Sequence, residues 1–294
     1  MLPLESVPNV SEGRDDVTIG ALAAAFSSRG ARLLDVHSDS DHHRSVFTLV
    51  GDDEALVESL VAGIAAARER IDLRRHSGVH PRVGAADVVP VVPLAAGDMG
   101  RAQAAALEVA RRVGEELELP VFLYAESGGA GRRPSFFRQG GPDGLQRRVD
   151  AGELEPDFGP RRLDPRAGAV LVGARWSLVA FNVDLETDDV EVARAIAVAV
   201  RESSGGLPGV QALGLALART GRVQVSMNLL DVGASPLHHV VAYVREEARL
   251  RGVEIAGGEL VGLLPGSVVA AAAAPALALD WLASDRLLEL RLLD

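Results

Sequence analysis

The sequence lacks cysteine, which excludes disulfide frameworks, thiolate metal sites and thiol nucleophiles. It also lacks lysine, so all 30 basic residues are arginines. Replacement of lysine in a GC-rich genome accounts for this more simply than selection of arginine for its forked contacts with carboxylates. A functional role for any one arginine therefore has to be argued from its own surroundings.

Positive charge and aromatic residues are both in short supply. The chain has 30 basic against 41 acidic residues, a formal net charge of −11, and only 4% aromatics. Such an acidic surface repels a phosphate backbone, so we expect no nucleic-acid partner. Hydrophobic residues make up 48% of the 294 residues, which is typical of a globular protein with an aliphatic core.

No signal peptide or membrane span is expected. The N-terminus has no basic stretch followed by a long apolar run. The apolar tract at 267–283 is short and contains Pro275 and Asp280, which favours a buried helix over a membrane span. We therefore expect a cytoplasmic protein without a membrane partner. Residues 266–294 carry no motif to which a role can be assigned.

Periodicity predicts an α/β fold of the α+β type in two related halves, residues 1–175 and 176–294. In each half the order strand–helix–strand–strand–helix–strand gives a ferredoxin-like β-α-β-β-α-β sheet with helices on one face. The first half begins with a strand at 4–9 and a helix that is opened by Ser11 or Asp15 and runs to about residue 28. Strands at 31–37 and 44–50, a helix at 53–71 and a strand at 87–92 follow, with an added helix at 98–116 and strand at 120–125. The second reads as 177–184, 188–203, 209–217, 222–230, 235–251 and 253–262.

A long connection at 127–168, rich in Gly, Pro and Arg, joins the halves. Connections longer than about 15 residues within a compact protein are usually functional. This segment is therefore a candidate for ligand binding on length alone.

Histidines are concentrated in the first half, and two of them share the segment RRHSGVHPRVGAADV. The spacing of His76 and His80 is that of a zinc-protease helix, but Ser77 replaces the required glutamate and Gly78 and Pro81 would break the helix. We therefore expect a structured loop and no metal. The spacing leaves open whether these histidines carry chemistry, although their ordinary pKa of about 6.5 suits proton transfer.

Seven strings in order across about residues 7–265 resemble the glutamate formimidoyltransferase (formiminotransferase) family. The strings are VPNVSEGRD, LLDVHSDSDHHRSVFTLVG, HSGVHPRVGAADVVPVVPL, LPVFLYAES, PDFGP, VGARWSLVAFNVDL, and QVSMNLLD with GGELVGLLP. The resemblance implies transfer of a formimidoyl group from N-formimidoyl-L-glutamate to N5 of tetrahydrofolate, a step of histidine degradation. It further implies two subdomains with a substrate tunnel between them, tetrahydrofolate as co-substrate, no metal and no cyclodeaminase domain. A homodimer is possible.

The same resemblance places the catalytic role on His80. Because the pKa of an imidazole lies near neutrality, one histidine can take the proton from N5 and then protonate the departing glutamate amine. Arg82 could hold a substrate carboxylate in a forked pair, or could be a solvated loop residue. Asp39 and Asp41 could stabilise a protonated formimidoyl group, or could be turn residues bonded to their own backbone.

Further substrate contacts are predicted at His43, Arg44, Asn182 and Asn228. The family more often has Asn where His43 stands. Asn182 and Asn228 interrupt apolar runs, so each is either a structural hydrogen-bond hub or a substrate ligand. The family's folate segment follows the pattern Gly-Pro-x-x-x-x-Pro-x-x-Gly. That pattern assigns folate binding to Gly159, Pro160, Arg161, Arg162, Leu163, Asp164, Pro165, Arg166, Ala167 and Gly168.

Three other hypotheses remain open at this point. A related folate enzyme acting on 5-formyltetrahydrofolate would use the same segment and the same histidine. A folate-binding protein without turnover would keep folate affinity after loss of His80. A histidine-cluster metallohydrolase would require bound metal.

Overall fold

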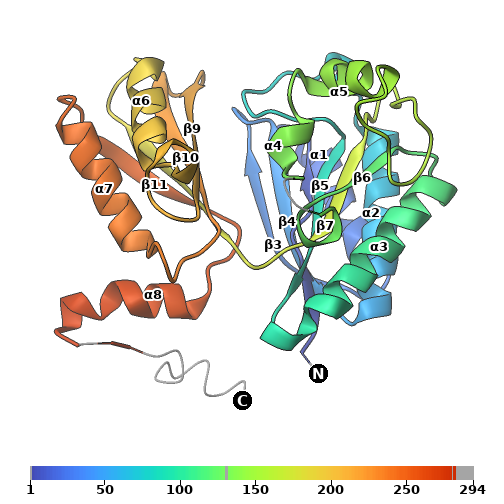
Figure 1. Cartoon of the computed structure of the whole chain (residues 1–294), viewed down its shortest axis with the longest axis horizontal. Helices are drawn as coiled ribbons and strands as arrows, with labels where there is room; N and C mark the ends of the chain where they lie inside the picture. Colours follow the sequence, from blue (N-terminus) through green and yellow to red (C-terminus); the bar gives the residue numbers. More distant parts are fainter. Residues whose placement is uncertain (1, 130–131, 280, 283–294) are drawn as a thin grey trace. The chain divides into compact units, whose positions relative to one another are not determined.

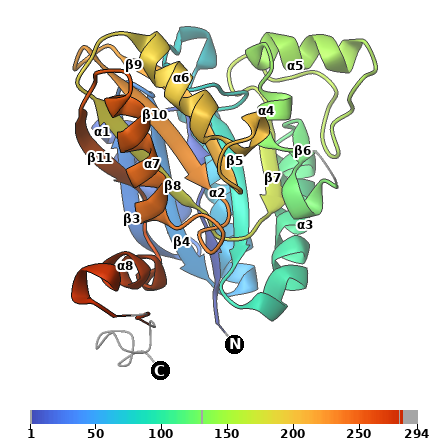
Figure 2. The same cartoon turned by 60° about the vertical axis from the view of Figure 1, so that its left-hand side comes forward.

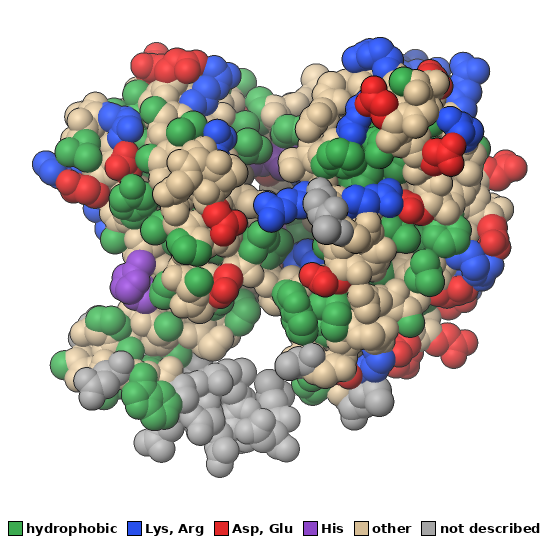
Figure 3. Space-filling model, in the orientation of Figure 1, with side chains coloured by type: hydrophobic (Ala, Val, Ile, Leu, Met, Phe, Trp, Pro, Cys, Tyr) green, Lys and Arg blue, Asp and Glu red, His purple; other side chains and the backbone are tan. Residues whose placement is uncertain are grey.

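The computed structural model describes residues 2–129, 132–279 and 281–282. The chain forms two compact units, unit 1 at Met1–Ser177 and unit 2 at Leu178–Asp294, each with its own sheet (Figure 1). On the face shown in Figure 3, acidic and basic side chains are interspersed over both units.

Unit 1 is built on a seven-stranded mixed sheet. Its strands are β1 (Leu4–Ser6), β2 (Asn9–Val10), β3 (Arg32–Asp39), β4 (Arg44–Gly51), β5 (Ala86–Pro93), β6 (Val121–Leu123) and β7 (Val170–Ala174). Its α-helices are α1 (Asp16–Phe26), α2 (Asp53–Arg70), α3 (Met99–Glu116), α4 (Pro134–Phe137) and α5 (Gly141–Asp150).

The predicted ferredoxin-like order is confirmed in the first part of unit 1. Strands β1 and β2 both lie between β4 and β5, β3 pairs with the other edge of β4, and all these pairings are antiparallel. Strand β7 then pairs in parallel with β5, and β6 pairs in parallel with β7. The sequence analysis missed β7, a five-residue buried strand that comes directly after the Gly/Pro/Arg-rich connection.

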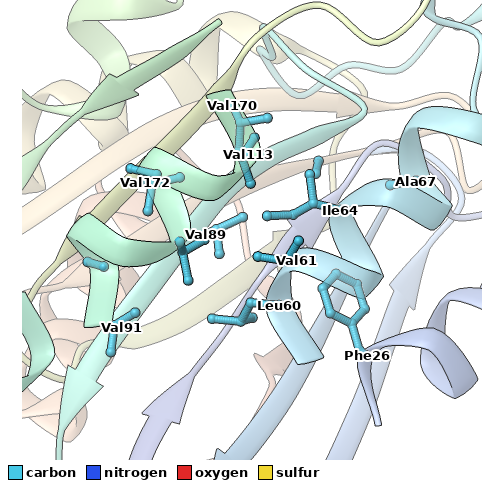
Figure 4. Packing of buried hydrophobic residues seen from close by; sticks show 14 of the residues in the cluster. Phe26, Leu60, Val61, Ile64, Ala67, Val89, Val91, Val113, Val170 and Val172 are labelled. Carbon is cyan, nitrogen blue, oxygen red and sulfur yellow. The ribbon is translucent and has the colours of Figure 1, made fainter. Parts of the chain in front are cut away.

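The helices of unit 1 do not all lie on one face of the sheet, which corrects the prediction for this half. Helices α1 to α3 pack on the face that carries Val89 and Val172 (Figure 4). The alternate residues Val88 and Leu171 point to the other face, where they pack against Phe137 of α4 and the buried residues of α5. The connection at 127–168 therefore contains two short helices with a core of their own.

The helices begin where the sequence indicated. Asp15 caps α1 by accepting from the Val17 N–H, and Asp52 caps α2 by accepting from the Ala55 N–H. Close packing of α1 on α2 depends on Gly63, because a Cβ there would lie 2.0 Å from the ring of Phe26. Figure 4 shows Phe26 beside this turn of α2.

Among its described residues, unit 2 has the ferredoxin-like arrangement with no strand added to its sheet. Its elements are β8 (Val179–Leu185), α6 (Val190–Val200), β9 (Val210–Leu217), β10 (Arg222–Leu229), α7 (Leu237–Arg249), β11 (Ile255–Val261) and α8 (Gly266–Ala273). The strand order β11-β8-β10-β9 is antiparallel throughout. Helices α6 and α7 share one core with the sheet, and both lie on its near side in Figure 2. The fold class is confirmed in both units.

The apolar tract at 267–283 forms a helix, but it is not the buried helix that we expected. Within α8 only Val268 and Ala270 are buried, and Val269 is 52% exposed. Residues 280 and 283 of the tract lie outside the described residues. Across the residues that the structure describes, no helix combines the length and apolarity needed to cross a bilayer.

Candidate active site

Three loops of unit 1 come together next to the start of β5. They are residues 9–15, the β3–β4 turn at 39–44, and the loop at 76–85. Two glycines allow their close approach: a Cβ on Gly13 would lie 2.2 Å from the Asp39 carbonyl oxygen, and one on Gly78 would lie 2.4 Å from that of His42. The loops thereby gather four of the seven histidines of the chain.

His80 has a defined tautomer. Its Nδ1 lies 2.8 Å from the Pro81 carbonyl oxygen, an acceptor, so Nδ1 carries the proton and Nε2 keeps its lone pair. The imidazole is densely surrounded by protein although part of the residue is accessible, and its ring centroid lies 5.7 Å from that of His42. Burial, together with the charges of Arg44 and Arg138, holds the pKa of His80 well below its ordinary value. The ring is therefore neutral at pH 7, as a general base must be.

A buried carboxylate, Asp87, organises the charges beside His80. Its Oδ2 accepts from Arg44 Nη1 at 2.7 Å and from Arg138 Nη2 at 2.5 Å, and its Oδ1 accepts from the Val83 N–H at 2.7 Å. Burial alone would raise the pKa of Asp87, but the two guanidinium groups and the Val83 N–H outweigh it and hold the pKa far below its usual range. Arg44 also donates from Nε to Asn9 Oδ1 at 2.9 Å.

Arg82 is held within the loops. Its Nε and Nη2 donate to the His80 carbonyl oxygen, at 3.1 and 2.8 Å. Nη1 donates to the His43 carbonyl oxygen at 2.9 Å and lies 2.9 Å from His76 Nε2, and Nη2 donates to the His42 carbonyl oxygen at 2.7 Å. Each of the three guanidinium nitrogens thus donates to a loop carbonyl oxygen. Arg82 would have to exchange some of these contacts to hold a substrate carboxylate, so that role stays a prediction.

His43 and His76 form a stacked pair, with ring centroids 3.8 Å apart and planes 15° apart. His43 has φ of 50°, in the left-handed region, and its ring nitrogens lie 3.0 Å from the Ser77 carbonyl oxygen and 3.0 Å from Glu12 Oε1. Burial and the neighbouring Arg82 and His43 lower the pKa of His76 to about 4, so His76 is neutral. Its Nε2 lies 3.2 Å from the His43 carbonyl oxygen and 2.9 Å from Arg82 Nη1.

Glu12 ties the first loop to this pair. Its Oε1 accepts from the backbone N–H groups of Gly13, Arg14 and Asp15. Burial acts to raise the pKa of Glu12, but the N–H groups of Arg14 and Asp15 together with His43 outweigh it and lower the pKa. Both ring nitrogens of His43 are engaged by these contacts, and binding of a substrate by His43 stays a prediction.

The two aspartates of the β3–β4 turn have backbone partners. Asp39 Oδ1 accepts from the His42 N–H at 2.7 Å, and the Asp41 carbonyl oxygen accepts from the Val79 N–H at 3.2 Å. The Asp39 contact is that of a turn residue, whereas the Asp41 contact joins the turn to the loop at 76–85. A role for either carboxylate in stabilising a protonated substrate group stays a prediction.

The predicted folate segment, residues 159–168, is rigid at both ends. Gly159 and Gly168 have φ of 79° and 70°, and a Cβ on either would lie 2.1 Å from a backbone oxygen, of Leu119 and of Val83 respectively. Asp164 Oδ1 accepts from the N–H groups of Arg166 and Ala167 at 2.7 and 2.9 Å. A substitution at either glycine would therefore disturb the backbone.

The end of this segment adjoins the histidine loop. The Ala85 N–H donates to the Ala167 carbonyl oxygen at 2.8 Å, and the Ala169 N–H donates to the Val83 carbonyl oxygen at 3.0 Å. Arg166 also lines an open depression of about 520 Å³ together with Glu12, His43 and His76. The structure thus brings together in unit 1 the histidine loop, the β3–β4 turn and one end of the predicted folate segment.

Other side chains of the segment have local partners or face solvent. Arg161 pairs with Glu155 and donates to the Val149 carbonyl oxygen at 3.0 Å, whereas Arg162 is exposed. Leu163 is buried, and its N–H donates to Gln146 Oε1 at 2.7 Å.

The two asparagines of unit 2 have different surroundings. Asn182 on β8 is buried and donates from Nδ2 to Glu259 Oε2 of β11 at 2.9 Å, as a structural hub would. Asn228 on β10 is exposed. Substrate binding by either stays a prediction.

Four polar residues of the unit 1 site received no role from the sequence: Asn9, Glu12, Asp87 and Arg138. The first three lie within the strings that carry the family resemblance, and Asp87 stands out as an acidic residue inside the apolar run GAADVVPVV. No motif or spacing singled out Arg138, which lies in the long connection at 127–168. Its contact with Asp87 spans 51 positions in the sequence.

Fold and site together define a two-unit α/β protein whose polar centre is a neutral histidine beside a buried ion network. The family model described as "Formiminotransferase domain, N-terminal subdomain" matches residues 3–175, and that described as "Formiminotransferase domain" matches residues 180–278. The chain belongs to the formiminotransferase family.

Relatives with assigned names agree with this. A glutamate formimidoyltransferase of Streptococcus pyogenes serotype M1 is 39% identical over 269 residues, 90% of each chain. One of Thermoplasma acidophilum is 40% identical over 272 residues, covering 89% of this chain and 88% of the relative. A formimidoyltransferase-cyclodeaminase of Rattus norvegicus is 38% identical over 92% of this chain, which spans 52% of that longer protein.

Proposed function

We propose that the chain transfers the formimidoyl group of N-formimidoyl-L-glutamate to N5 of tetrahydrofolate, giving 5-formimidoyltetrahydrofolate and L-glutamate in histidine degradation. Membership of the formiminotransferase family and two relatives named glutamate formimidoyltransferase at 39% and 40% identity support this activity. The observation in the site that carries the proposal is the neutral imidazole of His80, which keeps the lone pair on Nε2.

The reaction needs two proton transfers, and His80 can perform both. As N5 bonds to the amidine carbon, Nε2 accepts the N5 proton. When the tetrahedral intermediate collapses, the imidazolium gives the proton to the departing glutamate amine and returns to its neutral form. The Nδ1 hydrogen bond to the Pro81 carbonyl oxygen persists through both steps and orients the ring.

Tetrahydrofolate acts as co-substrate, and residues 159–168 are proposed to hold it. The fixed backbone at Gly159 and Gly168 supports this, because a rigid loop can lie close to a flat pterin ring. Asp39, Asp41, His43, Arg44, Asn182 and Asn228 are proposed to contact the substrates. Each unit is proposed to supply one half of the transferase.

Three further parts of the proposal concern the protein's surroundings. It is proposed to work without a metal. It resides in the cytoplasm, and it can pair as a homodimer. Metal analysis and sedimentation of the purified protein test the first and the last.

The activity is tested by following product formation spectroscopically from formimidoylglutamate and tetrahydrofolate. We expect turnover by the wild type and a loss of roughly 10²–10⁴-fold in His80→Ala, with folate affinity nearly kept. His239→Ala on α7 is the matched control and should keep wild-type turnover. No turnover with formimidoylglutamate, or turnover only with 5-formyltetrahydrofolate, would contradict the proposed donor, and full activity of His80→Ala would remove His80 from the mechanism.

A further inference from the structure

The ion network beside His80 has more positive than negative charge. Arg44 and Arg138 both donate to the same oxygen of Asp87, whose side chain is fully buried. The side chains of Arg44 and Arg138 are themselves only 7% and 14% exposed. Two guanidinium groups and one carboxylate leave one positive charge at a site largely withdrawn from water. Burying an uncompensated charge costs free energy unless a further anion neutralises it.

Arg138 also has unused capacity for a hydrogen bond. Its Nε is buried and has no hydrogen-bond partner, whereas buried polar groups are nearly always paired. Both guanidinium groups act electrostatically on His80, and Asp87, the carboxylate that they share, accepts from the N–H of Val83, three residues after His80.

We propose that Arg138, together with Arg44, binds one carboxylate of the amino-acid donor beside His80. The inference rests on the proposed function and names the subsite of that reaction that recognises the donor. Arg138 thus becomes a residue that determines specificity for a dicarboxylic amino-acid derivative, a role that the sequence analysis had offered to Arg82.

Neighbouring arginines are less suited to this task. Each guanidinium nitrogen of Arg82 donates to a carbonyl oxygen of the loops. Arg132 Nε is also buried without a hydrogen-bond partner, but Arg132 has a carboxylate to itself, in a forked pair with Asp157 at 2.6 and 3.0 Å. Arg148 donates to the Phe136 carbonyl oxygen at 2.7 Å. Arg138 differs because it shares its carboxylate with a second arginine.

Binding at this pair has a consequence for the base. The groups that act on His80 are Arg44 on β4, Arg138 after α4, His42 in the β3–β4 turn and Asp87 on β5, and the positive ones lower its pKa. A donor carboxylate would offset one positive charge and raise the pKa of His80. The base would then become stronger only after the donor has bound, so that proton removal from N5 follows donor binding.

The test compares Arg138→Gln and Arg138→Lys with the matched control Arg132→Gln. Losing one charge-assisted contact should raise the KM for formimidoylglutamate about 10- to 100-fold in Arg138→Gln while leaving the KM for tetrahydrofolate within about twofold. Arg138→Lys should recover part of the loss. The acid limb of kcat/KM should move to higher pH in Arg138→Gln, because a positive charge near His80 is gone. An unchanged donor KM in Arg138→Gln, or an equal rise in Arg132→Gln, would overturn the proposal.

A binding measurement separates this inference from the proposed activity. Calorimetry with N-formyl-L-glutamate, without tetrahydrofolate, should show binding to the wild type and weaker binding to Arg138→Gln. Equal affinities would overturn the carboxylate subsite even if the enzyme is active. Binding that depends on Arg138 in a protein without formimidoyl transfer would instead refute the proposed function and leave the subsite standing.

A measurement on the wild type covers the case in which Arg138→Gln does not fold. Titration of the His80 imidazole by NMR, assigned with His80→Ala, should show its pKa rising when N-formyl-L-glutamate is added. Absence of any rise at saturation would overturn the proposal.

Discussion

The two units share one arrangement of strands and helices, yet they differ in what has been added to it. Unit 2 consists of the four-stranded sheet with α6 and α7, followed by α8. Unit 1 continues past the same arrangement with α3, β6, α4, α5 and β7, and this extension delivers Arg138 to the site around His80. The shared framework provides the core, whereas the charge network depends on the addition.

The polar contacts of the two units differ in the same way. In unit 1, Asp87 is buried among two guanidinium groups next to a histidine. In unit 2, Asn182 and Gln224 donate to Glu259 and Asp184 along neighbouring strands. The contacts of unit 1 therefore group three charged side chains near a titratable histidine. The contacts of unit 2 connect neighbouring strands. The difference can be tested by removing one member of each.

The largest effect on stability is expected for Asp87→Ala. Its loss leaves Arg44 and Arg138 without their shared partner, so the free energy of unfolding should fall by about 3–5 kcal/mol. Asn182→Ala, which removes a neutral amide from unit 2, should cost only about 1–3 kcal/mol. Urea denaturation measures both. Equal costs would contradict the contrast between the units.

A smaller effect is expected at a glycine where two segments touch. Gly84→Ala places a Cβ 1.9 Å from the Ala169 carbonyl oxygen, so it should destabilise by about 1–3 kcal/mol and lower turnover by shifting the histidine loop. Gly257→Ala in unit 2, where a Cβ meets no atom within 4 Å, is the control and should lie within about 0.5 kcal/mol of the wild type. Thermal melting curves and initial rates measure both effects. A Gly84→Ala variant with wild-type stability and turnover would show that the backbone can move to accommodate the Cβ.

The smallest expected effect is a loss of folding stability as the pH falls. The pKa of His76 is about 4 in the folded protein, below the ordinary 6.5 of the unfolded chain, so the unfolded state binds more protons between these values. The stabilisation is complete above pH 6.5 and is lost as the pH falls toward 4. Because His76 is only half-buried, we expect a loss of about 1–2 kcal/mol. His76→Gln should flatten the dependence of unfolding on pH in this window, and an unchanged slope would contradict the assignment.

Much of the fold could be predicted because its signals are local. The alternation in RVQVSMNLL and the caps at Asp15 and Asp52 set strand and helix positions without reference to the rest of the chain. Strand β7 was missed because VLVGA is short and is buried on both faces, which leaves no alternation to read. Helix α4 was missed because it is a single turn of four residues, and α5 was missed because glycine and proline stand in its first turn.

The candidate site was only partly predictable because its contacts are between residues far apart in the sequence. The strings identified His80, but not that the Pro81 carbonyl fixes its tautomer. Arg82 was predicted either to hold a substrate carboxylate or to be a solvated loop residue, and its contacts with the backbone oxygens of His42 and His43 could not be read from the strings. Arg138 reaches Asp87 across 51 positions, a distance over which no local pattern carries information.

The contact of Gly84 with Gly168 has a mechanical consequence. The two glycines form an isolated antiparallel bridge, flanked by hydrogen bonds on either side, so the backbone that follows His80 and the last residue of 159–168 move as one piece. Under the folate role proposed for residues 159–168, a shift of this segment on ligand binding would be carried to the imidazole through main-chain atoms. Binding of folate and orientation of the His80 ring would then be coupled through the backbone.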